Sequence, residues 1–475
     1  MTPLTDAVRR QYERFPYPPV PVLAAPARGQ GERLRWETGR ALAATATMDH
    51  GLPERHDGMR ILVAGAGTLE ALVVAGAHPR AREVVAVDLS AASLRALGRR
   101  VALARTANAV RLGPLLGRRL PPVRRVCADL HTWSGGTFDF ILANNVLQHV
   151  PDPAALLARL AGWLSPGGMV RVVTYPSMGR CWIRWTRRWL ELHGVRAEPG
   201  ARGRAAAAAM ALPPGHPLRS CWDGHLETGT DAGVVDGFLH ALERPLPPLA
   251  WAQALSTCGL RLVAEANESS GEALVELLPE TAALGPWERM QVLDDLLETS
   301  DNHVWWLRHG ETEAPGTAGD SPPPGSATDL SPETPVESVL TSPTWSLPSA
   351  IYAELGASLR RAASLLHGAG VTLDEAVDTL RREVGPHVHA RSGAELARLS
   401  IGEHDLAAIL GTPPPWDDST WEAAAAAGVT HLIHDGARVP GQTLAEQAAW
   451  LHCLHGAMRS RIPIQVAMTG GAGSP

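Results

Sequence analysis

Continuous apolar runs alternate with helical stretches between residues 60 and 175, and this alternation constrains the fold more than any other feature. The stretches with helical periodicity are Leu69–Gly76, Ala91–Ala107 and Pro153–Leu164, and the apolar runs around them are Ile61–Ala64, Glu83–Asp88, Val126–Asp129, Phe138–Ala143 and Met169–Tyr175. Strands that are apolar throughout and alternate with helices are typical of a parallel sheet covered on both faces. The sequence therefore predicts an α/β fold with a Rossmann-like, doubly wound, mostly parallel sheet.

The rest of the chain predicts one further domain. Strands at Leu260–Val263 and Ala273–Leu277 bring the sheet to seven, and a helix over Pro286–Arg308 closes it. This gives a first domain at 1–308, with a core at 58–175 and a helical insertion at 176–248. Residues 309–347 are rich in Pro, Ser and Thr and predict a disordered linker. Residues 348–475 regain helical periodicity and predict a small, mainly helical accessory domain, which we expect to bind a protein partner.

Composition excludes several classes of function. The net charge is −6, which argues against nucleic acid as the main partner. All 43 basic residues are arginine, so Schiff-base chemistry and a Walker A lysine are excluded. Five cysteines without a C-x-x-C pair predict neither a disulfide framework nor a zinc ribbon. With no signal-peptide pattern and no long apolar span, the expectation is a soluble cytoplasmic protein.

The strongest chemical signal is a glycine turn followed by an acid on the next strand. Gly65-Ala66-Gly67 follows a buried strand, and Asp88 ends the next one. Glycines let a ligand approach the backbone closely, and an acid at that place can accept both hydroxyls of a ribose. A dinucleotide site would need a third glycine, and none follows Leu69-Glu70. Asp129, after the third strand, adds an acceptor for an adenine amino group.

Further motifs follow in order along the chain. They are Phe138-Asp139 in the fourth strand, Asn144-Asn145-Val146-Leu147-Gln148-His149-Val150-Pro151-Asp152-Pro153 after it, and then Leu164-Ser165-Pro166-Gly167-Gly168. Over residues 60–175 this series resembles the class I S-adenosylmethionine-dependent methyltransferases. The leader Gln11-Tyr12-Glu13-Arg14-Phe15-Pro16-Tyr17-Pro18 is similar to that of one bacterial branch with a tyrosine- and proline-rich N-terminus. Two departures are Leu69 in place of the third glycine and Gln148-His149 in place of a histidine pair.

The resemblance implies S-adenosylmethionine as the cofactor and carries a set of candidate residues. The cofactor-binding candidates are Gly65, Ala66, Gly67, Asp88, Leu89, Asp129, Leu130 and Asn144, with Tyr12 and Tyr17 as a lid over the cofactor. Two alternatives stay open: Asp129 as the N-cap of a turn, and the two tyrosines as an aromatic staple for the N-terminus.

His149, Asp236 and His240 are the candidates for acid–base catalysis. An imidazole titrates near neutrality, so His149 suits a general base, or it is a structural histidine of the loop. Asp236, His240 and Glu243 have the spacing i, i+4 and i+7, which places them on one face of a helix, either as a catalytic cluster or as a solvated face. No metal site is predicted, because nothing forces the three histidine pairs after residue 386 to converge.

These observations predict direct displacement of the methyl group onto an acceptor. The Asn-Pro-Pro-Tyr loop of amino-methylating nucleic-acid enzymes is absent, which favours a small molecule or a peptide. A catalytically silent, adenosylmethionine-binding regulatory or interaction protein is the alternative. A nicotinamide-dependent oxidoreductase is disfavoured by the missing third glycine.

Overall fold

The computed structural model describes residues 2–23, 31–47, 57–109, 120–212, 217–266, 271–296 and 302–310, with shorter stretches between residues 358 and 468. The chain divides into two compact units. Unit 1 comprises Met1–Pro213, Cys221–Ser270 and Ser300–Pro315, and unit 2 comprises Pro214–Ser220, Gly271–Thr299 and Gly316–Pro475. Unit 2 thus takes two segments, Pro214–Ser220 and Gly271–Thr299, from within the range 1–308.

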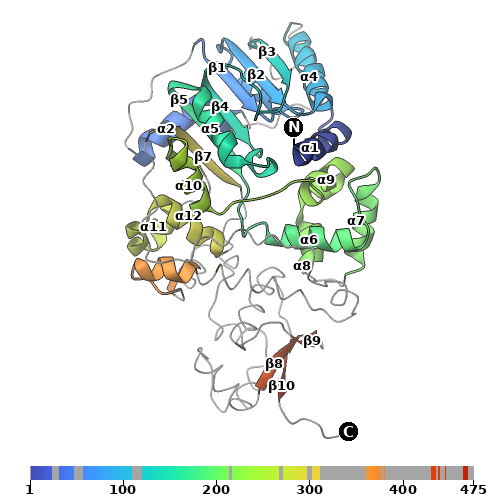
Figure 1. Ribbon diagram of the computed structural model, residues 1–475, viewed down its shortest axis with the longest axis vertical. Coiled ribbons are helices and arrows are strands. Elements are labelled where there is room, and N and C mark those ends of the chain that lie inside the picture. Colours follow the sequence, from blue (N-terminus) through green and yellow to red (C-terminus); the bar gives the residue numbers. More distant parts are fainter. Residues whose placement is uncertain are drawn as a thin grey trace. The chain divides into compact units, whose positions relative to one another are not determined.

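Unit 1 is built around a seven-stranded sheet in the order β3-β2-β1-β4-β5-β7-β6 (Figure 1). Its strands are β1 (Arg60–Ala64), β2 (Glu83–Asp88), β3 (Val123–Cys127), β4 (Phe138–Asn144), β5 (Leu164–Thr174), β6 (Leu260–Glu265) and β7 (His303–His309). The neighbours from β3 to β5 are parallel, whereas β7 is antiparallel to both β5 and β6. The prediction of a seven-stranded, mostly parallel, Rossmann-like sheet is confirmed.

Helices cover both faces of this sheet. Ile61, Leu62 and Val63 of β1 are fully buried, and successive residues of a strand point to opposite faces, so neither face is open. Helices α2 (Trp36–Thr47), α3 (Glu70–Ala77) and α4 (Ala91–Ala109) share one apolar core with the sheet. Helices α5 (Pro153–Trp163) and α10 (Pro248–Thr257) pack against each other and against β5 and β6.

The last two elements predicted for the first domain were wrong. Ala273–Leu277, predicted as a strand, lies within helix α11 (Gly271–Leu277). The helix predicted over Pro286–Arg308 ends early, as α12 (Pro286–Asp295), and the residues from His303 onward form β7. The periodicity was misleading because Trp305, Trp306 and Leu307 are all buried, and such a run also suits a strand between two partners.

The insertion after β5 is helical, as predicted. It contains α6 (Cys181–Leu192), α7 (Ala201–Met210), α8 (Pro217–Gly224), the 3₁₀ helix η3 (Leu226–Gly229) and α9 (Asp231–Phe238). Side chains of α6, α7, α8 and α9 meet in an apolar core of their own. Shorter elements of unit 1 are the leader helix α1 (Pro3–Arg14), η1 (Glu32–Leu34) and η2 (Leu147–His149).

In unit 2, α11 and α12 share a core with residues 362–376, and η4 (Pro279–Ala283) lies between these two helices in sequence. Its strands β8 (Val429–His434), β9 (Ala437–Arg438) and β10 (Ile464–Met468) form a sheet in the order β10-β8-β9, which helical periodicity did not predict. Residues 311–347 of the predicted linker and most of 348–475, including the histidine pairs His387/His389 and His452/His455, lie outside the described residues. His309 and Gly310 are described, and His309 ends β7.

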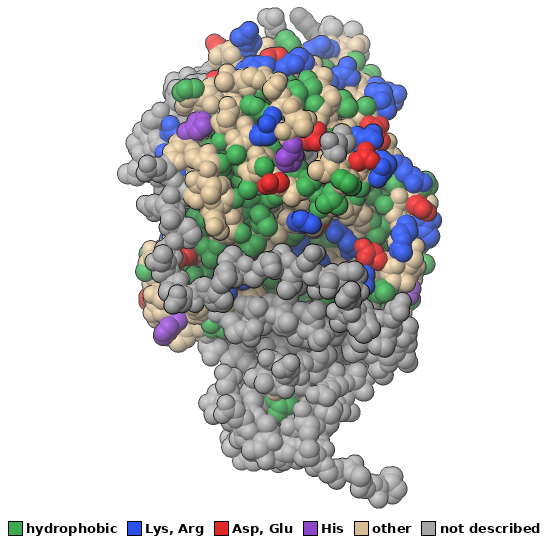
Figure 2. All heavy atoms as spheres, viewed as in Figure 1, with side chains coloured by type: hydrophobic (Ala, Val, Ile, Leu, Met, Phe, Trp, Pro, Cys, Tyr) green, Lys and Arg blue, Asp and Glu red, His purple; other side chains and the backbone are tan. Residues whose placement is uncertain are grey.

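The surface of the described part mixes charges of both signs. On the face shown in Figure 2, arginines and acids are interspersed around a hydrophobic area. None of the described helices has the length and apolarity needed to cross a bilayer.

Candidate active site

A cavity of about 440 Å³ lies in unit 1, beyond the carboxyl ends of the parallel strands. The structure brings to this cavity every site residue predicted from the sequence except His240, which lies directly behind its wall. The predicted residues that line it are Tyr12, Tyr17, Gly65, Ala66, Gly67, Asp88, Leu89, Asp129, Leu130, Asn144, His149 and Asp236. Strand ends of one parallel sheet meet at the same edge, which is where ligands bind in such folds.

The glycine turn after β1 needs both of its glycines. Gly65 and Gly67 have φ angles of +67° and +53°, which disfavour any other residue. A Cβ on Gly65 would lie 2.4 Å from a Val146 methyl, and one on Gly67 would lie 2.8 Å from the Tyr17 carbonyl oxygen. Leu69 replaces the family's third glycine at a φ of −140°, which any L-residue adopts. The turn therefore keeps its shape without that glycine.

Asp88 joins the glycine turn to the end of β2. Its Oδ2 accepts the Gly67 N–H at 2.8 Å, and its Oδ1 accepts the Ser90 N–H at 2.8 Å. Burial raises the pKa of this carboxyl to about 6, although the two hydrogen bonds oppose the shift. Each carboxylate oxygen can accept a second hydrogen bond, as a ribose would require.

Asp129 follows β3 and faces the same cavity. Its Oδ1 accepts the His131 N–H at 2.9 Å, and its carbonyl oxygen accepts the N–H groups of Thr132 and Trp133. This is the capping geometry that the sequence left open, and it coexists with a place in the cavity lining. Leu89 and Leu130 also line the cavity and add apolar surface to it.

A buried polar chain lies where β4 and β5 meet α3. The Asn144 amide donates to Glu70 Oε1 at 2.6 Å, and the Arg171 guanidinium donates to Asn144 Oδ1. Burial raises the pKa of Glu70 to about 7, with Arg171 opposing the shift. Asn144 therefore links the Glu70 carboxyl to the Arg171 guanidinium, and both of these residues line the cavity.

The leader binds both the glycine turn and the insertion. The Tyr17 carbonyl accepts the Thr68 N–H at 3.0 Å, and the Pro18 carbonyl accepts the Thr68 hydroxyl at 2.7 Å. The Tyr17 hydroxyl donates to Glu227 of η3, and Gln11 Oε1 accepts the Ala241 N–H at 2.7 Å. Tyr17 is therefore anchored both to the glycine turn and to the insertion.

The catalytic candidates converge from three segments. The Leu242 N–H donates to His240 Nδ1 at 3.0 Å, so the His240 proton lies on Nε2, which donates to the Tyr12 hydroxyl at 3.0 Å. That hydroxyl in turn donates to Asp236 Oδ1 at 2.9 Å. His149 stacks on His240 with ring centroids 3.8 Å apart.

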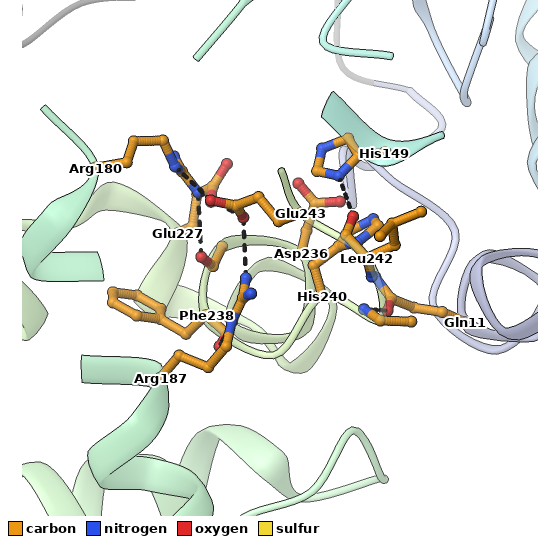
Figure 3. Close-up of polar contacts among 12 residues, drawn as sticks. Gln11, His149, Arg180, Arg187, Glu227, Asp236, Phe238, His240, Leu242 and Glu243 are labelled. Carbon is orange, nitrogen blue, oxygen red and sulfur yellow. Dashed lines mark hydrogen bonds and ion pairs between the residues drawn. The ribbon is translucent and has the colours of Figure 1, made fainter. Parts of the chain in front are cut away.

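His149 is held in one tautomer. Its Nδ1–H donates to the Leu242 carbonyl oxygen at 2.8 Å, as Figure 3 shows, so its Nε2 carries the lone pair. Burial lowers the pKa of His149 to about 4, and burial with the neighbouring His149 lowers the pKa of His240 well below its usual value. Both imidazoles are therefore neutral at physiological pH.

The helix face predicted for Asp236, His240 and Glu243 was wrong. Helix α9 ends at Phe238, and the prolines that follow at 245, 247 and 248 favour extended backbone. Asp236 and His240 still meet, but through Tyr12. The Glu243 carboxylate is fully buried between Arg180, at 2.9 Å, and Arg187, at 3.0 Å (Figure 3).

One comparison identifies a domain of the chain. Residues 62–170 match the family model described as a methyltransferase domain. The chain contains a class I, S-adenosylmethionine-dependent methyltransferase domain. This confirms the resemblance inferred from the motifs within residues 60–175, and the matched range includes the glycine turn, Asp88, Asp129, Asn144 and His149. The likeness of the leader to one bacterial branch stays a prediction.

Curated relatives of this chain are similar to it over part of their length. An uncharacterized protein of Synechococcus sp. is 31% identical over 246 residues, which are 50% of this chain and 55% of that protein. A trans-aconitate 2-methyltransferase of Azoarcus sp. is 34% identical over 32% of this chain and 48% of its own. The chain spans about half the length of the curated relatives it matches. The solved structure of PKMT2 from Rickettsia typhi in complex with AdoHcy has a TM-score of 0.44 and 15% identity, over 57% of this chain and 53% of that one.

Sequence reasoning missed several residues that line the cavity of the methyltransferase domain. They are Arg33, Glu70, Arg171, Tyr175 and Glu227. Arg171 could have been predicted as a site residue, because an arginine inside a buried apolar strand needs a polar partner. Glu227 had no such signal, since its contact with Tyr17, 210 residues earlier in the chain, follows from no local pattern. Among the described residues, no group of three His, Cys, Asp or Glu side chains is arranged to hold a metal ion.

Proposed function

We propose that this protein transfers a methyl group from S-adenosylmethionine to a small-molecule or peptide acceptor by direct displacement. One observation carries the proposal. The glycine turn and Asp88 line the same cavity as Tyr12, His149 and Asp236, which arrive from the leader, the loop after β4 and the insertion. Cofactor residues and titratable side chains therefore share one enclosed space.

The residues present fit the cofactor. A side chain at Gly65 would collide with Val146, and one at Gly67 would collide with the Tyr17 carbonyl, so both positions require glycine. Both glycines line the cavity, where a ligand can approach the backbone. Asp88 would accept the ribose hydroxyls, and Asp129 would accept an adenine amino group. When bound, S-adenosylmethionine supplies an electrophilic methyl group on sulfur.

The chain's own contribution is alignment and proton removal. The stack of His149 on His240 fixes both rings. Because His149 Nδ1–H donates to the Leu242 carbonyl oxygen, the lone pair of His149 lies on Nε2, on the other side of the ring. Asp236 is held by Tyr12 at the cavity wall. Burial and the nearby Glu227 raise the pKa of Asp236 to about 7, so its carboxyl can exchange a proton near neutrality.

Location and partners are part of the proposal. The four cysteines in the described part of the chain, Cys127, Cys181, Cys221 and Cys258, are free thiols, which supports a reducing compartment such as the cytoplasm. For residues 348–475 we keep the proposal of a protein partner.

Two measurements test the function. Calorimetric titration should show S-adenosylhomocysteine binding to the purified chain, and labelled S-adenosylmethionine should transfer its label to a component of fractionated host extract. No binding would refute the cofactor site. Binding without transfer to any fraction would favour the silent, adenosylmethionine-binding alternative.

A further inference from the structure

Tyrosines are concentrated on one wall of the cavity. The chain has four tyrosines, and Tyr12, Tyr17 and Tyr175 all line this space. They come from α1, from the leader beyond it and from the end of β5. The fold thus gathers three electron-rich rings at one place, and such faces attract cations.

Two carboxylates complete this surface, which we call the tyrosine–acid wall (Tyr12, Tyr17, Tyr175, Glu227 and Asp236). Tyr17 donates to Glu227, and Tyr12 donates to Asp236. Asp236 is 4% exposed, and the negative charge of Glu227 adds to burial in raising its pKa. The two acids therefore repel each other, and a positive charge between them would relieve the repulsion.

The nearby cations are already engaged. The Arg180 guanidinium binds Glu243 at 2.9 and 3.1 Å and covers the Tyr175 ring at 3.8 Å, and Arg187 binds the same carboxylate at 3.0 Å. Neither arginine lines the cavity. His149 and His240 are neutral, so they do not balance the wall.

Two arginines do line the cavity, and both belong to elements outside the tyrosine–acid wall. Arg171 donates to Asn144 beside Glu70, and Arg33 lies in η1. Outside the cavity lining, the His225 imidazole lies 3.3 Å from Glu227 Oε2. Among the described residues that line the cavity, however, no arginine pairs with the acids of the tyrosine–acid wall. A carboxylate acceptor would meet the charge of Glu227, whereas a cation would complement it.

Resting on the methyl transfer proposed above, we infer that the acceptor is an amine, which binds as its ammonium form against the tyrosine–acid wall. The ammonium must lose a proton before its nitrogen has a lone pair. That proton moves from the nitrogen to the Asp236 carboxylate, leaving a neutral amine and a carboxylic acid. Methylation then forms one N–C bond and breaks one S–C bond, whose electron pair stays on sulfur.

Binding of three matched probes tests this inference. They are n-butylamine, n-butanol and butyrate, each titrated calorimetrically into the full chain saturated with S-adenosylhomocysteine. We expect the amine to bind at least about tenfold more tightly than the alcohol or the carboxylate. Binding should also release a fraction of a proton at pH 7, because an ammonium favours ionised Asp236. Titration in buffers of different ionisation enthalpy measures that release.

Matched variants assign the effect to the wall. Glu227→Gln should weaken butylamine binding about tenfold and leave butanol binding unchanged, and Asp236→Asn should abolish the proton release. Glu191→Gln is the control, since this half-exposed acid of α6 pairs with Arg188 away from the cavity. S-adenosylhomocysteine affinity in each variant shows that the domain is folded.

Three outcomes overturn the inference: no measurable butylamine binding, equal or tighter binding of butyrate, or amine affinity that survives both substitutions. When S-adenosylhomocysteine still binds, each of these outcomes contradicts the inference of an amine acceptor and leaves the proposed cofactor site standing. Loss of S-adenosylhomocysteine binding by the unmodified chain would instead refute the proposed function.

Discussion

At the scale of single residues, Asp88 determines both the shape of the glycine turn and the fit to a ribose. Replacing it with alanine leaves the N–H groups of Gly67 and Ser90 without their acceptor and removes the acceptor for both ribose hydroxyls. We expect Asp88→Ala to weaken S-adenosylhomocysteine binding by about 100-fold or more in calorimetric titration. Near-normal affinity would show that this residue does not hold the ribose.

The pKa of Asp88 also predicts a pH dependence. The pKa is raised to about 6, and the ionised carboxylate is the better acceptor, so affinity should be constant above pH 7. It should fall by up to about tenfold for each pH unit below 6. Glu70 titrates in a similar range, so the comparison with Asp88→Asn isolates the effect. An equally steep profile in that variant would assign the dependence to another group.

The Tyr12 hydroxyl connects two residues of the cavity wall. Tyr12→Phe leaves His240 Nε2–H without an acceptor and Asp236 Oδ1 without a donor, both in a buried environment. We expect a loss of about 1–3 kcal/mol in the free energy of unfolding, measured by denaturant titration. Methyl transfer should fall, while S-adenosylhomocysteine affinity stays within about twofold of normal. An equal loss of both would place Tyr12 on the cofactor instead.

At the scale of elements, the leader and the glycine turn form one structure. Gly67→Ala places a Cβ 2.8 Å from the Tyr17 carbonyl, which would force the leader away from the turn. Gly58→Ala is a matched control, because Gly58 also has a positive φ, of +77°, but no atom within 4 Å of an added Cβ. Both variants should lose about 1 kcal/mol from backbone strain. Only Gly67→Ala should also lose S-adenosylhomocysteine affinity, as calorimetry would show.

At the scale of the whole molecule, unit 2 combines segments that precede and follow the predicted linker. Leu365 and Leu366 pack with Leu274 and Val292, although the predicted linker separates them in sequence. Asp295 is fully buried and accepts hydrogen bonds from Ser358, at 2.6 Å, and Arg361, at 2.7 Å. These contacts tie α12 to the segment that follows the predicted linker.

A protease cut placed between residues 311 and 347 should therefore leave two fragments that elute together in gel filtration. Asp295→Ala should let them separate, because it leaves Ser358 and Arg361 without their acceptor. Glu280→Ala, at an exposed acid of the same unit, should leave the fragments together. Fragments of the unmodified chain that separate at once would show that this core does not hold them.

The sequence by itself determined the elements whose signals are local. Strands β1, β2 and β4 were predicted because a strand buried on both faces must be apolar throughout, and the glycine turn because positive φ angles select glycine. Asp88 and Asp129 followed from their positions at strand ends, because those ends of a parallel sheet lie on one edge. Asn144 followed from the family resemblance of the motif after the fourth strand.

Only the tertiary structure decided the features that depend on distant partners. The run Trp305-Trp306-Leu307 is a strand because β5 and β6 lie on either side of it, whereas Ala273–Leu277 has no such neighbours and is helical. Tyr12, His149 and Asp236 meet at one cavity although more than 80 residues separate each from the next in sequence. Their convergence is set by helix packing and loop paths, and no local pattern in the sequence encodes it.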